Sequence, residues 1–488
     1  MEHPTATTQE IRAFYDDVFA AGEIRDNELL YHWIVRLLRP RRAARLLDVA
    51  CGSGWLLHAA ARAGLQPAGL DISPKAVEKA RAFVPGAEVT AGDGEHLPWP
   101  DTSFDYVTCL GSLEHYLHPD QGVREITRVL RPGAAAAIML PNSFPLGDLL
   151  KLAFTGRVEE DWQIVERHAA REEWRRFLEA NGLRVTAVHR YNKYPELFTP
   201  GACWKIKSLR KFAERMVIRY LSPFNLAQQF VYICERAPAG AAASNGSGSS
   251  VPDQAYKVES NSQLAEAYDE VYQKRPVHRA DPHYRWILSL LRPKRGDRLA
   301  DLACGAGFLL QEAAKDGVAC AGIDLSPEGV KLARRHAPQA AVTLGDGENL
   351  PWPDSSFDFV TCLGSLEHYL HPERGVREMR RVVKPGGAVC IMLPNRYSWY
   401  IVRRVIKSGE PPSEQAGFER LNTAAGWRRL IEENGLRVRR VIPQNEIKHL
   451  VDRERRQLKS VGKWLDSRLV RALCPFHLAY HFVFLCEK

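Results

Sequence analysis

The stretch LLDVACGSGWLL, residues 46–57, decides the fold of this chain, and it has a second copy, LADLACGAGFLL, at residues 299–310. In both copies a short apolar run ends in an acidic residue, Asp48 or Asp301, and leads through a turn of small residues into a second apolar run. Glycine is required where a backbone turns tightly and a ligand approaches without a Cβ in the way. The stretch therefore predicts a strand, a tight turn and a helix whose first N–H groups face a ligand.

The duplication extends over almost the whole chain of 488 residues. The offset of 253 positions that relates the two turns also pairs LPWPDTSFDYVTCLGSLEHYLHP, residues 97–119, with a nearly identical string at residues 350–372. The repeats predict two complete domains, residues 1–236 and 254–488. Residues 237–253, APAGAAASNGSGSSVPD, are small or polar and cannot bury a core, so they predict a flexible linker.

Within each repeat, runs typical of strands alternate with runs typical of helices, and short glycine-rich joints connect them. This alternation predicts an α/β fold of two Rossmann-like domains, each a mostly parallel sheet with helices on both faces. In such sheets, ligands bind beyond the carboxyl ends of the strands. For the first repeat we expect strands at 44–50, 67–72, 87–93, 104–110, 134–141 and 183–191, and helices at 55–64, 74–84 and 119–133.

The composition is that of an ordinary globular protein, with 45% hydrophobic and 26% charged residues. A net charge of +9 permits an anionic partner without requiring one. The beginning of the chain has no signal-peptide pattern and no apolar run is long enough to span a membrane, so we expect a cytoplasmic location. The ten cysteines include no CxxC pair, which favours reduced, buried thiols and predicts no metal site.

A second acidic residue, Asp71 or Asp324, ends the next strand 17 residues after the second glycine of the turn. A carboxylate in this place can accept hydrogen bonds from both hydroxyls of a ribose. The alternative, a carboxylate that caps the following helix, is less favoured because Ser73 and Ser326 already stand at the cap position.

A third acidic residue, Asp93 or Asp346, follows the third strand in AGDGE and LGDGE. It can accept from the exocyclic amine of adenine while the neighbouring backbone N–H meets a ring nitrogen. Neither motif contains Lys or Arg, and the chain has no GxxxxGK[ST] sequence, so phosphate is not the favoured ligand. The ligand should combine adenosine with a positively charged or zwitterionic remainder.

Together with LPWPDTSFDYVTCLGSLEH and the turns RVLRPGA and RVVKPGG, these motifs make each repeat resemble the class I S-adenosylmethionine-dependent methyltransferases of the type 11 group, which includes the UbiE-like enzymes. The resemblance covers each repeat and excludes the linker. It implies a seven-stranded sheet whose last strand is antiparallel, for which AYHFVFLCEK, residues 479–488, is suited. One departure is that Ala50 and Ala303 stand where the family often has the first glycine of GxGxG.

The resemblance implies S-adenosylmethionine as the methyl donor and S-adenosylhomocysteine as the product. By position, Asp48 would hold the methionine end, Asp71 the ribose, Ile72 the adenine face, and Asp93 with Gly94 the adenine edge. The implied cofactor residues are Tyr15, Asp48, Ala50, Gly52, Gly54, Asp71, Ile72, Asp93, Gly94 and Leu110, and, in the second repeat, Tyr268, Asp301, Ala303, Gly305, Gly307, Asp324, Leu325, Asp346, Gly347 and Leu363. For Tyr15 and Tyr268, a lid over the donor and a simple packing role stay equally open.

The candidate catalytic residues are His115 and His368, because the carboxyl end of the fourth strand should lie beside the reactive methyl group. Methyl transfer needs alignment of donor and acceptor, and a hydroxyl acceptor is helped by a general base, usually histidine. Alternatively, Glu114 and His115 begin a helix and only shape the donor pocket. We expect His118 and His371 to be capping or surface groups.

After MLPN, at residues 139–142 and 392–395, the two repeats diverge, which indicates different acceptor pockets. Residues 203–226 and 452–478 read as basic amphipathic helices that could contact a membrane surface or an acidic substrate, although a solvated face is the commoner case. Nucleic acid is an unlikely partner by motif content. The two repeats could also pack as an internal pseudo-dimer.

The sequence thus predicts a tandem methyltransferase acting on a small-molecule, glycan or lipid-linked acceptor, with oxygen favoured over nitrogen or carbon. One rival is that only one repeat is catalytic and the other is a scaffold. Another rival, a nicotinamide dehydrogenase, is disfavoured because Leu57 and Leu310 replace the third glycine of GxGxxG.

Overall fold

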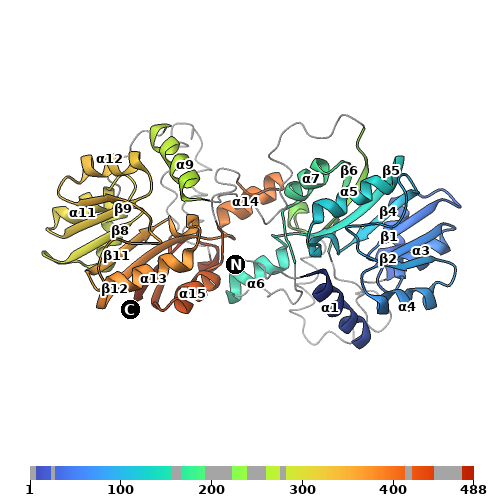
Figure 1. Cartoon of the computed structure of the whole chain (residues 1–488), viewed down its shortest axis with the longest axis horizontal. Coiled ribbons are helices and arrows are strands. Elements are labelled where there is room, and N and C mark those ends of the chain that lie inside the picture. Colours follow the sequence, from blue (N-terminus) through green and yellow to red (C-terminus); the bar gives the residue numbers. More distant parts are fainter. Residues whose placement is uncertain are drawn as a thin grey trace. The chain divides into compact units, whose positions relative to one another are not determined.

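The computed structural model describes residues 7–22, 28–156, 166–192, 222–238, 260–274, 282–412, 420–444 and 475–488. These residues form two compact units, one containing strands β1 to β7 and the other β8 to β14. Figure 1 shows each unit as a twisted sheet with helices on both faces. Most of the expected linker and of the two basic segments lies outside the described residues, so the domain boundaries and both amphipathic helices stay predictions.

Each unit contains one seven-stranded sheet, as expected from the resemblance. The strand order is β3-β2-β1-β4-β5-β7-β6 in the first unit and β10-β9-β8-β11-β12-β14-β13 in the second. All neighbours are parallel except β7 and β14, which run antiparallel to the strands on both sides. The strands are β1 Arg45–Val49, β2 Gln66–Asp71, β3 Glu88–Ala91, β4 Phe104–Leu110, β5 Leu130–Pro141, β6 Leu183–Tyr191, β7 Gln229–Arg236, β8 Arg298–Leu302, β9 Ala319–Asp324, β10 Ala341–Leu344, β11 Phe357–Leu363, β12 Val383–Pro394, β13 Arg437–Gln444 and β14 His481–Glu487.

The helices of the second unit repeat the order of those in the first. The first unit has α1 Thr8–Ala21, α2 Glu28–Leu37, α3 Trp55–Arg62, α4 Pro74–Phe83, α5 Pro119–Val129, α6 Leu146–Thr155 and α7 Arg171–Ala180, with 3-10 turns η1 Leu113–His115 and η4 Phe224–Leu226. The second has α9 Asn261–Lys274, α10 Pro282–Leu291, α11 Phe308–Lys315, α12 Pro327–His336, α13 Pro372–Val382, α14 Trp399–Ser408 and α15 Ala424–Glu433, with η5 Leu366–His368 and η6 Phe476–Leu478.

The alternating side chains of the strands build a core on each face of the sheet. In β1, Leu46 packs with α2 and α3 on one face, whereas Leu47 packs with α5 and α7 on the other, and both are fully buried. A sheet buried on both faces explains why its strands read as continuous apolar runs. Phe104 and Phe357, the first residues of β4 and β11, are buried as well.

Most expected elements are confirmed, and one helix boundary is wrong. Strand β4 has the bounds expected from the sequence, and Ser73 caps α4 by accepting from the Ala76 N–H. The helix expected over 119–133 instead ends at Val129. The residues that follow join β5 as an irregular start, in which Gly133 has a φ of +76° and the pairing with β4 shifts register.

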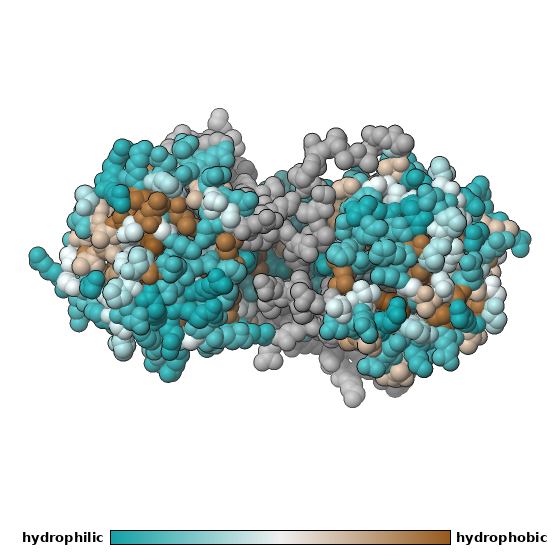
Figure 2. Space-filling model, viewed as in Figure 1, coloured by the Kyte–Doolittle hydropathy of each residue, from teal (hydrophilic) through white to brown (hydrophobic). Residues whose placement is uncertain are grey.

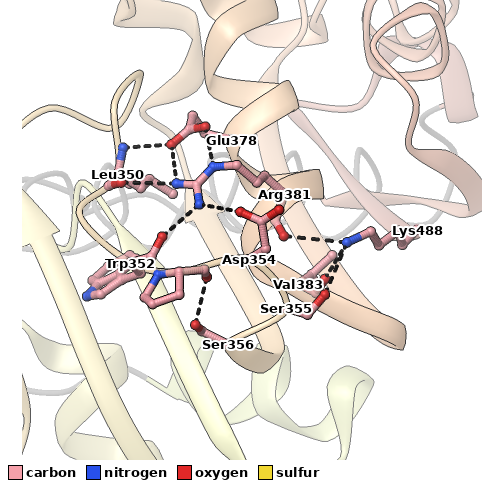
Figure 3. A network of polar contacts seen from close by, with 10 residues as sticks. Leu350, Trp352, Asp354, Ser355, Ser356, Glu378, Arg381, Val383 and Lys488 are labelled. Atoms are coloured by element: carbon pink, nitrogen blue, oxygen red, sulfur yellow. Dashed lines mark hydrogen bonds and ion pairs between the residues drawn. The ribbon is translucent and has the colours of Figure 1, made fainter.

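The repeated string LPWPDSS, residues 350–356, is a loop that an arginine attaches to the neighbouring helix (Figure 3). The Arg381 guanidinium in α13 donates to Glu378 at 2.7 Å and to Asp354 at 2.9 Å, and it also reaches the carbonyl oxygens of Trp352 and Leu350. In the first unit, Arg128 makes the same set of contacts with Glu125, Asp101, Trp99 and Leu97. The string therefore has a structural reason to recur that is independent of ligand binding.

The eight cysteines that the structure describes are unpaired and buried, in agreement with the expectation of reduced thiols. Over the described residues, the face drawn in Figure 2 is mostly hydrophilic, with hydrophobic residues gathered in smaller patches. Within the described ranges, no helix is both long and apolar enough to cross a membrane. The cytoplasmic location stays a prediction.

Candidate active site

The turn after β1 holds its backbone in the left-handed region at three positions. The φ angles are +61° at Ala50, +52° at Gly52 and +86° at Gly54, and the second unit has the same pattern at Ala303, Gly305 and Gly307. A Cβ on Gly54 would lie 3.2 Å from the Cα of Ala80, so this glycine lets α3 begin close against α4. Ala50 adopts a conformation that costs an L-residue about 1 kcal/mol or more, which explains why glycine is common at this point of the motif.

Leu57, at the position where a nicotinamide-binding helix carries glycine, is fully buried against β2. The room for it comes from the strand, because a Cβ on Gly69 would lie 2.8 Å from the Leu57 Cδ1 atom. The equivalent pair in the second unit is Leu310 with Gly322. The helix–strand contact thus has its glycine in the strand rather than in the helix, unlike the dinucleotide motif.

Asp71 fixes the glycine turn to the end of β2. Its Oδ2 accepts from the Gly52 N–H at 2.8 Å, and its Oδ1 accepts from the Ser73 N–H at 2.9 Å. A carboxylate has about four lone-pair sites, so it can accept ribose hydroxyls in addition. Because the Gly52 N–H is already used, the turn is poorly suited to a phosphate. The corresponding contacts of Asp324 are with Gly305 at 2.7 Å and Ser326 at 2.9 Å.

Asp48 lies buried at the end of β1, next to the end of β4, where the Thr108 hydroxyl donates to it at 2.6 Å. Burial raises the pKa of Asp48 to about 7, with the Thr108 hydrogen bond opposing the shift, and burial likewise raises the pKa of Asp71 to about 6. In the second unit, Thr361 donates to Asp301, whose pKa burial also raises to about 7, and burial raises the pKa of Asp324.

Among the described residues, no Lys or Arg forms an ion pair with Asp48 or Asp71. Two buried carboxylates without a cationic partner are complementary to a positively charged ligand. The donor set therefore fits a ligand that combines a ribose with a sulfonium and an ammonium group.

The third carboxylate is more exposed, and its surroundings differ between the units. Asp93 accepts from the Glu95 N–H at 2.9 Å, and its second oxygen lies 3.9 Å from the Nδ1 of His96. Asp346 accepts from Glu348 and also from the Asn261 side chain of α9 at 2.8 Å. A Cβ on Gly94 would overlap the Tyr116 hydroxyl, so glycine here is required by packing as well. Gly347 meets Tyr369 in the same way.

Helix α1 lies against the glycine turn. Its Asp16 accepts from the Ser73 hydroxyl and, at 3.3 Å, from the Lys75 N–H at the start of α4, and Phe19 lies 3.4 Å from the place of a Cβ on Gly52. Tyr15, from the same helix, is partly buried, and burial together with the nearby carboxylates of Glu114 and Asp71 raises its pKa. In the second unit, Asp269 and Tyr272 of α9 hold the corresponding places. These contacts attach α1 to the glycine turn, and both the lid role and the packing role of Tyr15 stay open.

His115 is buried in the short turn η1 directly after β4, so the expected helix start is a single 3-10 turn. Its Nε2 lies 3.8 Å from Glu114, beyond hydrogen-bond length. In the second unit, His368 lies in η5 and meets the Tyr268 ring edge to face, with 5.7 Å between centroids. His118 is exposed at the first position before α5, where its side chain makes no capping hydrogen bond.

Sequence reasoning missed a buried arginine behind this turn. The Arg167 guanidinium donates to the carbonyl oxygens of Glu114 at 3.3 Å, of Leu117 at 3.4 Å and of Tyr116 between them. In the second unit, Arg420 donates to Tyr369 and Leu370. The arginine therefore fixes the backbone that carries the candidate catalytic histidine. The available signal was the pair Glu-Arg at 166–167 and again at 419–420, in segments that otherwise differ.

The remaining predicted residues stand at the same edge. Ile72 and Leu325 directly follow Asp71 and Asp324 and are partly buried, and Leu110 and Leu363 end β4 and β11 before the turns that carry the histidines. The structure thus brings the carboxyl ends of β1, β2 and β4 together, with the third carboxylate after β3.

The family model described as "Methyltransferase domain" matches residues 47–138 and 300–391, once in each unit. Demethylmenaquinone methyltransferase of Corynebacterium kroppenstedtii is 32% identical to the chain over 165 residues, covering 71% of that protein and 28% of this chain. The chain belongs to this methyltransferase family. It is an S-adenosylmethionine-dependent methyltransferase with two tandem domains, and S-adenosylhomocysteine is the product.

Other methyltransferases are similar to the chain as well. Ubiquinone biosynthesis O-methyltransferase of Paracidovorax citrulli is 35% identical over 131 residues, covering 54% of that protein and 25% of this chain. Among solved structures, phosphoethanolamine N-methyltransferase 2 of Haemonchus contortus shares 14% identity at a TM-score of 0.33, covering 94% of this chain and 98% of its own. A methyltransferase of Mesorhizobium loti shares 16% identity at a TM-score of 0.32, covering 42% of this chain and 98% of its own.

Proposed function

We propose that each unit binds its own donor at the carboxyl edge of its sheet and transfers the methyl group to an oxygen of a small-molecule acceptor. The observation that carries this proposal is the repetition of one set of contacts. In both units, two buried carboxylates at neighbouring strand ends lack a cationic partner among the described residues, and one of them is hydrogen-bonded to the glycine turn. A scaffold repeat would have no reason to hold two such carboxylates at a cost in stability.

The roles follow from the position of each group. Asp71 accepts from the ribose hydroxyls, Asp93 and the Gly94 N–H meet the adenine edge, and Asp48 faces the charged methionine end. The donor supplies a methyl carbon activated by its bond to a sulfonium. The protein aligns the acceptor with that carbon and keeps bulk water away, for which the partly buried Tyr15 of α1 is suited. The equivalent roles in the second unit fall to Asp324, Asp346, Gly347, Asp301 and Tyr268.

Oxygen is the proposed acceptor atom for two reasons. A buried imidazole, His115 or His368, directly follows the strand whose end lies beside Asp48 or Asp301, and it can take the proton of an acceptor hydroxyl as the oxygen attacks. In addition, relatives at 29% to 35% identity carry the name ubiquinone biosynthesis O-methyltransferase. Nitrogen or carbon methylation is the alternative. In that case the histidines would only shape the donor pocket.

The acceptor is proposed to be a small molecule, including a glycan or a lipid-linked compound. Peripheral membrane contact through residues 203–226 and 452–478, packing of the two repeats as a pseudo-dimer and a cytoplasmic location remain predictions from the sequence.

Calorimetric titration of the full chain with S-adenosylhomocysteine tests the donor assignment. We expect two equivalents for the unaltered chain and one each for Asp71→Ala and Asp324→Ala. Asp71→Asn, which keeps the shape of the side chain, is the matched control, and it should weaken one site without unfolding the turn. Two full sites in either Ala variant would overturn the ribose assignment, and a single site in the unaltered chain would support a scaffold role for one repeat.

A further inference from the structure

The second unit has a polar pair at the far end of its ligand-binding edge. Gln444 ends β13 and pairs across the sheet with His481, the first residue of β14, which also pairs with Pro394 at the end of β12. Directly opposed residues of antiparallel strands place their side chains on the same face, about 5 Å apart. Strand β12 is the neighbour of β11, whose end leads to His368. His481 therefore lies two strand spacings, about 10 Å, from strand β11, whose end leads to His368.

Helix α10 contributes a third polar side chain to this pair. The Gln444 amide donates to the Nδ1 of His283 at 2.9 Å, and the His283 ring lies 5.6 Å from the Trp286 ring at an interplanar angle of 37°. An imidazole that accepts at Nδ1 carries its proton on Nε2 and is neutral. We name His283, Gln444 and His481 the polar edge cluster.

In the polar edge cluster, Oε1 of Gln444 and Nδ1 of His481 are buried without a hydrogen-bond partner in the described part of the chain. Buried polar atoms are nearly always hydrogen-bonded, because an unmade bond there is costly. Burial, and then the neighbouring His283, lowers the pKa of His481 to about 4, so its imidazole is neutral near pH 7. Both atoms therefore belong to side chains that are neutral near pH 7.

The first unit has different residues at the equivalent places. Leu30, Tyr191 and Gln229 correspond to His283, Gln444 and His481. Tyr191 stacks on Trp33 with 6.2 Å between centroids and an angle of 26°, and His189 meets the same Trp33 edge to face. This edge is mainly aromatic, although the Oε1 of Gln229 is also buried without a partner in the described part.

We propose that the polar edge cluster is the acceptor-recognition site of the second unit, and that it takes a neutral ring bearing neighbouring hydroxyl groups. One hydroxyl donates to Gln444 Oε1, a second bonds His481 Nδ1, and the ring lies beside Trp286. The first unit, which lacks this cluster, takes a different acceptor. This inference rests on the proposed function, because it assigns the substrate class of that site. The ring can be phenolic or a sugar, since both present vicinal hydroxyls.

Saturation-transfer NMR on the full chain, saturated with S-adenosylhomocysteine, tests the proposal with two probes, catechol and methyl α-D-glucopyranoside. We expect at least one probe to bind. Binding of catechol alone identifies a phenolic ring, binding of the glucoside alone a sugar, and binding of both shows that the hydroxyls suffice. If neither probe binds, the proposal is overturned.

Variants then locate the binding. Gln444→Leu and His481→Leu should each weaken the bound probe about five- to tenfold, the effect of losing one hydrogen bond between neutral groups. Gln229→Leu, at the place equivalent to His481 in the first unit, is the matched control and should leave probe affinity unchanged. Equal weakening by Gln229→Leu, or unchanged affinity in the Gln444 and His481 variants, overturns the proposal. His481→Gln, which copies the first unit, provides a folded variant if leucine is not tolerated.

Two further readouts separate recognition from a structural role. Because the His481 Nδ1 atom has no hydrogen-bond partner in the described part of the chain, His481→Leu should leave the urea midpoint equal or higher, whereas a structural role would lower it. Gln444→Leu also removes the hydrogen bond to His283, so its urea midpoint is not used for this distinction. S-adenosylhomocysteine should still bind at two equivalents in these variants. If the variants no longer bind the probe, and the unaltered chain transfers no labelled methyl group to the probe, the cluster is a binding site and the O-transfer proposal fails. If transfer occurs and the variants do not affect it, only the cluster assignment fails.

Discussion

The donor ends of the two units are nearly identical, whereas their acceptor ends differ in chemistry. Between residues 91 and 119 the repeats differ at only four positions, and the Thr108–Asp48 and Thr361–Asp301 hydrogen bonds are both 2.6 Å long. A few strands away, Tyr191 faces Gln229 in one unit and Gln444 faces His481 in the other. The proposed function accounts for this contrast by a donor common to both units and by different acceptors. On that proposal, donor and acceptor recognition are separable within one sheet edge.

The largest expected effect is at the histidines. His115→Gln and His368→Gln should each lower the kcat of their own unit about 100-fold or more, because the attacking oxygen loses its base. Labelled-methyl transfer measures this, with the Asp324→Ala chain reporting the first unit and the Asp71→Ala chain the second. S-adenosylhomocysteine binding should not change. If kcat falls less than about threefold in one unit, the imidazole of that unit only shapes the donor pocket. The two units would then differ at their donor ends.

The next largest loss of activity is expected at the two arginines that bind the histidine turns, Arg167 and Arg420. Arg167→Met and Arg420→Met remove the donors to the carbonyl groups of the histidine turn, so we expect kcat to fall at least about tenfold and stability to fall by about 2 kcal/mol. Arg→Lys at each position is the control and should recover part of the kcat. Because these residues position the turn, KM should change less than kcat. Reduced stability with an unchanged kcat would make Arg167 a purely structural residue.

A change of pH should have a smaller effect on donor affinity, and the effect should have the same sign in both units. Since burial raises the pKa of Asp48 and Asp301 to about 7 and the cationic donor prefers the ionised carboxylate, the Kd for S-adenosylmethionine should rise as pH falls below 7, by up to about tenfold per pH unit. S-adenosylhomocysteine, which lacks the sulfonium charge, should show a weaker dependence. Asp48→Asn should flatten the curve of the first unit, and a steep curve in that variant would refute the assignment.

The raised pKa of Asp48 also determines how the stability of the ligand-free chain depends on pH. A carboxyl group with a raised pKa binds its proton more tightly in the folded chain. The contribution of Asp48 to stability is therefore complete below about pH 4 and is lost as pH rises to about 7. Urea unfolding of the chain and of Asp48→Asn across this range checks the sign.

We expect the smallest effect, a change in stability, from substitutions in the glycine turn. Ala50→Gly and Ala303→Gly should each stabilise their unit by up to about 1 kcal/mol, because glycine adopts the left-handed conformation without the strain of alanine. Ala59→Gly within α3 is the opposed control and should destabilise by about 1 kcal/mol or more. Urea unfolding distinguishes the two. Equal effects at Ala50 and Ala303 would sharpen the view that the donor ends are equivalent.

The sheet and its donor edge could be predicted because their signals are local. The strand at 104–110 is a continuous apolar run bounded by turn residues, and Ser73 before Pro74 marks a helix start by itself. Each acidic residue then reaches the site simply by standing at the end of its strand. Each of these signals occurs twice in the chain, once in each repeat.

What could not be predicted depends on contacts between distant segments. Arg167 binds backbone carbonyl groups, which leave no trace in the sequence at positions 114 to 117. The pairing of Gln444 with His481 exists only because β14 inserts between β12 and β13, and an apolar run does not specify its neighbours. The end of α5 was misplaced because the irregular start of β5 resembles a turn.

The hydrogen bonds of Asp16 to Ser73 and Lys75 have a kinetic consequence. Helix α1 is attached two residues from the carboxylate that is proposed to bind the ribose, so we expect spent donor to leave faster once these bonds break. We expect product escape, rather than chemistry, to limit multiple turnover once the acceptor is abundant. Because Asp269 repeats the attachment on α9, both active sites should empty at similar speeds even while they serve different acceptors.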